Sequence, residues 1–200
     1  MTSPRARLSY DHGADPLEQD VEMSMDELAD LLRRIERSAF RLETLDTYSA
    51  PGEQELLRTF RSGQPMPRRH PDTEPWLRMT ADSVAAGRRW SRVHLVTRPL
   101  SEYMQFALLG YQGNVVAGED VRVADRTVAD PVLDALTTDF WLLDDNLALV
   151  MTYTEAGRLV GMTPAEDVEP YLQQRDIAMA HSVPLLEYLP SVRRELHRSW

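Results

Sequence analysis

The sequence predicts an α/β (or α+β) fold: a mixed sheet of about five strands with packed helices and an N-terminal helical segment. Residues 90–123 read as strand, helix and strand, because two apolar runs flank an amphipathic run, with Pro99 and Gly118 at the turns. Residues 139–153, DFWLLDDNLALVMTY, read as two apolar strands around a polar turn. A β-α-β unit brings parallel strands and a hairpin brings antiparallel ones, so the two together predict a mixed sheet.

Caps and periodicity predict the N-terminal helical segment. Ser24 and Glu27 have the spacing of a capping box. The apolar residues that follow are spaced for one helix face: Leu28, Leu31, Leu32 and Ile35. Two more helices are expected over residues 53–62 and 76–89, on either side of a connector that holds four prolines.

We expect a single domain over residues 21–200. Residues 1–20 mix Pro, Gly, Asp and Arg without a period, which is typical of a disordered or weakly docked tail. The domain itself divides into a helical part (21–89), a sheet-containing core (90–165) and C-terminal helices (166–200).

Composition favours a cytoplasmic protein. The chain has no Cys, which excludes disulfides, thiolate metal ligands and cysteine nucleophiles. No run approaches the roughly 18 apolar residues that a membrane helix needs, and no apolar segment follows the N-terminal arginines as it would in a secretory signal. We therefore expect no association with a membrane.

The charge of −10 is unevenly distributed, and all 22 basic residues are Arg. Residues 1–57 carry −7, residues 58–98 carry +6 and residues 99–200 carry −9. The middle segment, called the basic island below, either pairs with the two acidic segments or forms a face that binds an anion or an acidic partner. Because an acidic chain repels duplex DNA, direct DNA binding is not expected.

The usual catalytic and cofactor signatures are missing from the sequence. The five His show no metal-ligand spacing, and neither a GxSxG elbow nor a glycine-rich phosphate loop occurs. No metal, cofactor or catalytic residue is therefore predicted, and the sequence leans towards a protein that is not an enzyme.

Four arginines are the candidate ligand-binding or partner-binding residues: Arg88, Arg89, Arg92 and Arg98. They flank the first predicted strand of the β-α-β unit, so Arg88 and Arg98 are expected at its opposite ends. Ion pairs within the fold would explain these arginines, and an open anion site at Arg98 is the functional alternative.

Three carboxylates complete the candidate site: Glu119, Asp120 and Asp144. Glu119 and Asp120 begin the second strand of the β-α-β unit, with Glu119 expected near Arg92, and Asp144 lies at the hairpin tip. Pairing with the basic island and turn chemistry explain them structurally. The functional alternative is an acid or base in an enzyme site carried on loops.

Four segments resemble a family of actinobacterial proteins known only as a domain of unknown function. They are FRLETLDTY, RRWSRVHLVTRPLSEYMQFALLGYQGNVVAGEDVRV, DFWLLDD and YLQQRDIAMAHSVPL. The resemblance covers about residues 25–189, and members of that family are often found beside, or fused to, helix-turn-helix regulators. The order of elements is also similar to phospholipase D-like domains, but their HxK motif is absent because the chain has no Lys.

The resemblance implies a non-enzymatic regulatory or accessory protein that acts through a protein partner, such as a helix-turn-helix regulator. One alternative is a binding module for a small anionic or nucleotide ligand at the arginines. Another is an enzyme with a carboxylate site on loops. A homodimer is left open by the sequence.

Overall fold

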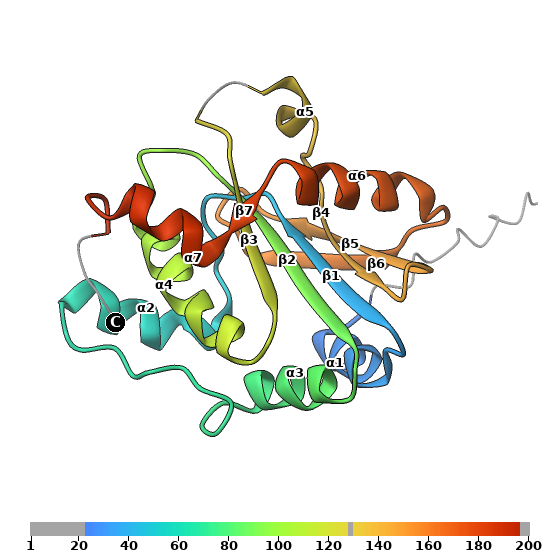
Figure 1. Ribbon diagram of the computed structural model, residues 1–200, viewed down its shortest axis with the longest axis horizontal. Helices are drawn as coiled ribbons and strands as arrows, with labels where there is room; N and C mark the ends of the chain where they lie inside the picture. Colours follow the sequence, from blue (N-terminus) through green and yellow to red (C-terminus); the bar gives the residue numbers. More distant parts are fainter. Residues whose placement is uncertain (1–22, 128–129, 197–200) are drawn as a thin grey trace, which may run out of the picture.

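The computed structural model describes residues 23–127 and 130–196. The expected tail at residues 1–20 lies outside this range. The described residues form a seven-stranded mixed sheet with strand order β6-β5-β4-β1-β2-β3-β7 (Figure 1). The strands are β1 (Ser38–Glu43), β2 (Arg89–Val96), β3 (Asp120–Asp125), β4 (Asp139–Leu143), β5 (Leu147–Tyr153), β6 (Leu159–Pro164) and β7 (Val183–Pro184). The mixed α/β class is confirmed, and the prediction of about five strands is too low.

Strand direction divides the sheet into two parts. β1, β2 and β3 are parallel neighbours, whereas β4, β5 and β6 continue from β1 as an antiparallel meander. The short β7 pairs with β3 in the antiparallel sense. The predicted β-α-β unit and hairpin are therefore joined through β1, which lies between β2 and β4.

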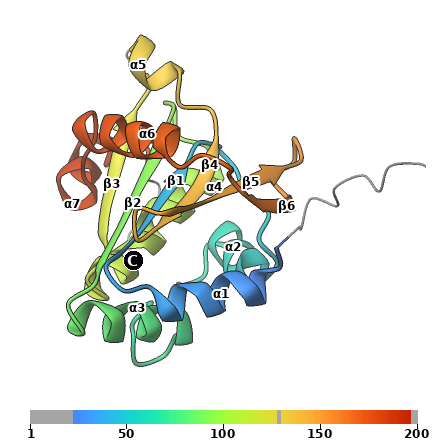
Figure 2. The same cartoon turned by 90° about the vertical axis from the view of Figure 1, so that its right-hand side faces the viewer.

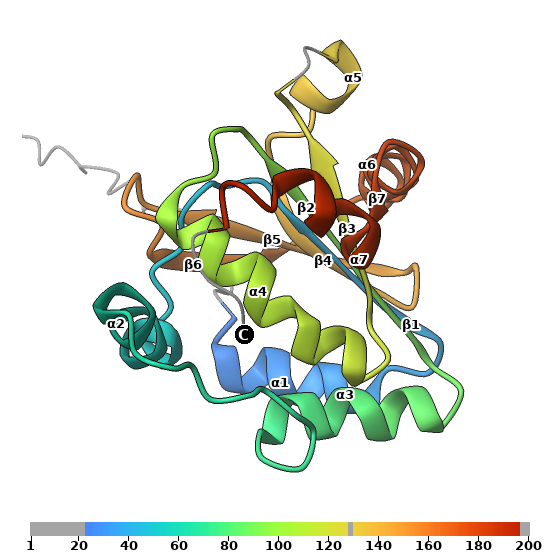
Figure 3. The same cartoon turned by 60° about the vertical axis from the view of Figure 1, so that its left-hand side comes forward.

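Helices cover both faces of the sheet. Figure 2 shows α6 on one side and α1 and α3 on the other, and Figure 3 shows α4 lying across the same side as α1 and α3. The helices are α1 (Met25–Arg34), α2 (Gln54–Ser62), α3 (Pro75–Ala85), α4 (Glu102–Val116), α5 (Pro131–Asp134), α6 (Glu169–Ala180) and α7 (Leu185–Tyr188). Because each face packs against helices, the central strands β1, β2 and β4 are buried on both sides for most of their length.

β1 corrects the prediction that residues 21–89 are helical. α1 has the predicted capping box of Ser24 and Glu27, but it ends at Arg34, and Ile35 has extended backbone with ψ 142°. In β1, apolar Phe40 and charged Arg41 point to opposite faces, as successive strand residues do. Arg41 and Glu43 are buried, so the charged side chains of β1 point into the interior.

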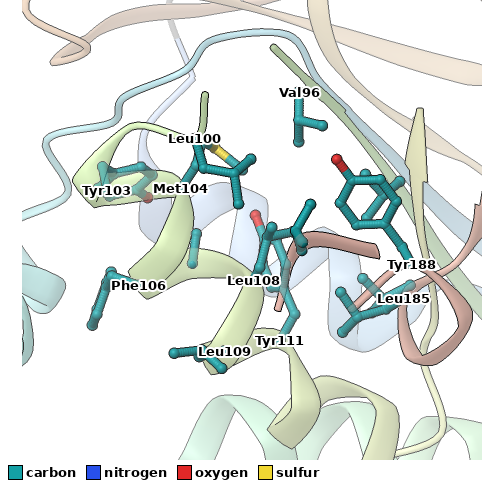
Figure 4. Close-up of a cluster of buried hydrophobic side chains, with 14 of the residues drawn as sticks. Val96, Leu100, Tyr103, Met104, Phe106, Leu108, Leu109, Tyr111, Leu185 and Tyr188 are labelled. Carbon is teal, nitrogen blue, oxygen red and sulfur yellow. The ribbon is translucent and has the colours of Figure 1, made fainter. Parts of the chain in front are cut away.

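The helix of the β-α-β unit carries the largest share of one apolar cluster. α4 packs on the sheet through side chains that include Met104, Leu108 and Tyr111, and α7 adds Leu185 and Tyr188 (Figure 4). On the same sheet face, Trp76, Trp90 and Trp141 form a triangle with ring centroids 6.0 to 6.2 Å apart. These clusters fix α3 and α4 against the strands that carry the candidate site residues.

Candidate functional site

Six ionisable side chains meet inside the protein on the sheet face covered by α4. None is more than 8% exposed, and they are Arg41, Glu43, Arg92, His94, Glu119 and Asp139. The strand register brings them together, since Arg41 lies opposite Arg92 and Glu43 opposite His94. We call this set the interior ion network.

The interior ion network is a continuous chain of ion pairs. Arg92 donates from Nε to Oε1 of Glu119 at 2.8 Å and from Nη1 to Oε2 of Glu43 at 2.7 Å. Arg41 donates from Nη2 to Oδ2 of Asp139 at 2.8 Å, and its Nε lies 3.8 Å from Oε1 of Glu43. Buried charges of this kind are tolerated because each one faces an opposite charge.

The hydrogen-bond partners of His94 indicate which of its ring nitrogens carry a proton. Its Nε2 lies 3.0 Å from the carbonyl oxygen of Leu45, which only accepts, so Nε2 must carry a proton. Its Nδ1 lies 2.9 Å from the hydroxyl of Tyr111, and that hydroxyl donates its single proton to Glu43 at 2.8 Å. This pattern of contacts calls for a donor at Nδ1 as well, which is the arrangement of a ring that carries a proton on both nitrogens.

Charge balance supports the same assignment. With His94 protonated, the interior ion network holds three cations and three carboxylates. Burial alone would raise the pKa of Glu43, but the charges of Arg92, His94 and Arg41 outweigh it and lower the pKa to about 2. Burial likewise raises the pKa of Tyr111 well above its usual value, so its hydroxyl remains a donor. Each charged member of the network faces an opposite charge, although Nη1 of Arg41 has no hydrogen bond among the described residues. The network acts as a scaffold.

A hollow lies on the opposite sheet face, where β1, β2 and β3 begin. It has a volume of about 580 Å³, and we call it the basal hollow. Ser38, Arg89, Ser91 and Asp120 line it because the register places them side by side on that face. α3 and α6 supply its walls, with Val84 from the first and Arg175, Asp176 and Met179 from the second.

Charged groups of the basal hollow fall into two classes. Arg175 is paired with Asp145 and Asp176, so this part of the rim is neutralised. Asp120 is 3.9 Å from the guanidinium of Arg122. By contrast, the guanidinium groups of Arg88 and Arg89 have no hydrogen bond or counter-ion among the described residues, although both line the same hollow.

The other predicted site residues lie elsewhere. Arg92 and Glu119 are paired in the interior ion network. Arg98, at the end of β2, donates from Nε to Oε1 of Glu195 at 2.6 Å. Asp144 accepts backbone N–H groups of residues 36, 37 and 38 at 2.7 to 2.9 Å. The structure thus brings together Arg88, Arg89 and Asp120, and separates them from the remaining four.

Five further residues that line the basal hollow were not among the predicted site residues: Ser38, Ser91, Asp145, Arg175 and Asp176. Ser38 carried no signal because β1 was not recognised as a strand, and Ser91 lies before the apolar run that marked β2. Arg175 comes from α6, more than 70 residues after the island, and only the fold brings it to the start of β1. Strand register, once known, would have predicted the serines but not Arg175.

Two smaller hollows differ in their charges. One of about 330 Å³ lies between the connector and α4 and is lined by Arg68, which has no counter-ion among the described residues. One of about 420 Å³ is lined by Glu53, Arg58 and Arg61. There Glu53 accepts a hydrogen bond from Tyr103 at 2.9 Å, and both arginines are paired with carboxylates.

Residues 23–127 and 130–196 contain no group of three or more His, Asp or Glu placed to hold a metal ion. Within the same ranges, no helix has the length and apolar character needed to cross a membrane.

A family model described as a domain of unknown function, DUF6879, matches residues 26–190. No curated protein matches the chain.

Proposed function

The chain belongs to the DUF6879 family, a domain of unknown function, and from this premise we propose that it is a non-enzymatic binding protein with a regulatory or accessory role. Its binding site is the basal hollow, and the ligand presents an anionic group to Arg88 and Arg89. This is the small-anion alternative that the arginines suggested in the sequence.

The proposal rests on which of the nine arginines of the basic island have a carboxylate as counter-ion. Among the described residues, six pair with a carboxylate: Arg58, Arg61, Arg69, Arg78, Arg92 and Arg98. Arg88 and Arg89 do not, and they are adjacent on one hollow. Guanidinium groups left without counter-ions in a concave site are suited to bind an anion from outside.

Two of the three carboxylates considered for catalysis favour binding over chemistry. Glu119 is engaged by Arg92 and by Nδ2 of Asn114 at 2.6 Å, and Asp144 is engaged by backbone N–H groups. Neither is free to exchange a proton with a substrate in the basal hollow. The proposal therefore assigns no catalytic role to them.

The protein partner predicted from the resemblance, such as a helix-turn-helix regulator, fits this proposal as the recipient of the signal. In that arrangement the anion changes how tightly the chain binds its partner. A pull-down from native cells tests this role. It is carried out with and without an anion that binds in the thermal-shift panel described next. Recovery of no regulator or DNA-associated protein in either condition contradicts it.

A thermal-shift panel tests the binding site. Phosphate, sulfate, citrate and nucleotides are titrated against the wild type, the double variant Arg88→Ala/Arg89→Ala and the control Arg68→Ala. Because a ligand that binds only the folded state stabilises it, at least one anion should raise the Tm of the wild type and of Arg68→Ala but not of the double variant. Equal shifts in all three proteins, or none in any, reject the site.

A further inference from the structure

We propose that the ligand of the basal hollow is a phosphate monoester of a small hydroxylated molecule, with its phosphate on Arg88 and Arg89. This inference rests on the proposed function, since it names the ligand of the same site. Four features of the hollow support it: its free donors, its volume, its free acceptor and its lack of an exposed aromatic ring.

The free donors match a phosphate group. Arg88 and Arg89 supply two guanidinium forks, and the hydroxyls of Ser38 and Ser91 have no hydrogen-bond partner among the described residues. Arg89 begins β2 directly opposite Ser38 of β1, and Ser91 points to the same face two residues later. A phosphate has three terminal oxygens that accept several hydrogen bonds at once, which suits a set of four donors better than a carboxylate does.

The volume indicates more than a bare ion. Sites for small molecules span about 300 to 1,000 Å³, and the basal hollow has about 580 Å³. Inorganic phosphate would leave most of this space to water. The ligand therefore carries a further part of its structure beyond the phosphate.

The free acceptor indicates what that further part contains. Asp120 lies beside Ser91 in the register, and its nearest cation, Arg122, is 3.9 Å away, which is beyond hydrogen-bond distance. Arg122 instead donates to the hydroxyl and the carbonyl oxygen of Ser182 at 3.0 and 2.7 Å. The Asp120 carboxylate can thus accept hydrogen bonds from ligand hydroxyls.

The aromatic residues of the hollow are unsuited to a nucleotide base. Phe40 and Trp90 line it, but they are only 3% and 2% exposed and present no open ring face. Stacking on an exposed aromatic ring is the usual contact by which a protein binds a base of any identity.

Calorimetry on the full chain tests the proposal with glucose 6-phosphate, glycerol 3-phosphate, inorganic phosphate, glucose and citrate as probes. At least one monoester should bind at least tenfold more tightly than inorganic phosphate, and glucose should not bind. Arg88→Ala/Arg89→Ala should weaken monoester binding at least tenfold, whereas Arg68→Ala should leave it unchanged.

Variants of the hollow separate the contacts. Asp120→Asn should weaken the monoester several-fold and leave inorganic phosphate unaffected, because only the hydroxylated part reaches Asp120. Ser91→Ala should weaken both. Circular dichroism verifies that each variant is folded.

The outcomes distinguish this inference from the proposed function. Citrate binding that depends on Arg88 and Arg89, without monoester binding, overturns the phosphate assignment and leaves the anion site intact. If no probe binds the wild type, or if monoester binding survives in Arg88→Ala/Arg89→Ala, the inference is wrong. If Arg88→Ala lowers stability but leaves binding unchanged, the role of Arg88 is instead to stabilise the C-terminal end of α3.

Discussion

The guanidinium of Arg92 and the carboxylate of Glu119 form a buried ion pair, 2.8 Å apart, between two parallel strands. The same guanidinium also holds Glu43 at 2.7 Å. Arg92 is therefore the central cation of the interior ion network, and its removal leaves two carboxylates buried without their main partner.

Arg92→Met should lower the free energy of unfolding by about 3–5 kcal/mol, because an ion left unpaired in the interior is strongly unfavourable. Urea unfolding at neutral pH measures the loss. Arg58→Met is the control, since Arg58 pairs with Glu55 on the exposed surface of α2 and should cost less than about 1 kcal/mol. Similar losses in the two variants would contradict the role assigned to Arg92.

Stability should fall in acid because of Glu43. Its pKa is about 2 in the folded protein, below the ordinary value of 4.5. A carboxyl group whose pKa is lower in the folded than in the unfolded protein stabilises the fold at pH values above its unfolded pKa. This stabilisation is lost as the pH falls from about 4.5 through 2. The full contribution is on the order of 3 kcal/mol.

Urea unfolding of the wild type and Glu43→Gln at pH 6 and pH 3 checks this prediction. The wild type should lose more stability between the two pH values than Glu43→Gln does. Glu55→Gln is the control because Glu55 is exposed, and it should follow the wild type. A Glu43→Gln variant with the same pH dependence as the wild type would show that Glu43 is not the responsible group.

Both ring nitrogens of His94 should carry protons in the folded protein. The carbonyl of Leu45 and the hydroxyl of Tyr111 both require a donor from the ring. Nitrogen-15 NMR at neutral pH distinguishes a protonated ring nitrogen from one with a free lone pair. His70, which is partly exposed, provides an internal comparison. A lone-pair signal from His94 would exclude the imidazolium.

Asp144 should prove to be a structural residue. Asp144→Ala removes the acceptor of three backbone N–H groups before and at the start of β1, and we expect a loss of about 2 kcal/mol. Asp144→Asn keeps an acceptor and tolerates the backbone, whose φ is 52°, so it should cost less. Urea unfolding measures both, and Asp144→Ala with wild-type stability would contradict this role.

The sequence predicted the elements whose patterns are local. The capping box of α1, the β-α-β unit and the hairpin of β4 and β5 all depend on neighbouring residues, and all are present. β1 was missed because residues 21–89 were expected to be helical, although Phe40, Arg41, Leu42 and Glu43 alternate with the period of two that strands have. Only a partner from another strand reveals why charge is tolerated there.

The candidate site depended on distant contacts in the same way. Parallel strand directions were enough to expect Arg88 and Arg98 at opposite ends of β2. Which arginines would find a counter-ion was not predictable, because Glu195 reaches Arg98 from 97 residues away. Arg88 and Arg89 stand out only after the pairs of the other arginines are known.

The central position of β1 has a consequence for the order in which the chain can fold. β1 pairs with β2 on one side and with β4 on the other, and Asp139 of β4 lies 98 residues after Arg41. In a ribosome-bound chain that stops before β4, Arg41 of β1 lacks Asp139, the carboxylate to which it donates in the folded protein. The domain should therefore become protease-resistant late in synthesis, after residue 139 has left the ribosome, as expected for a sheet with contacts between distant residues.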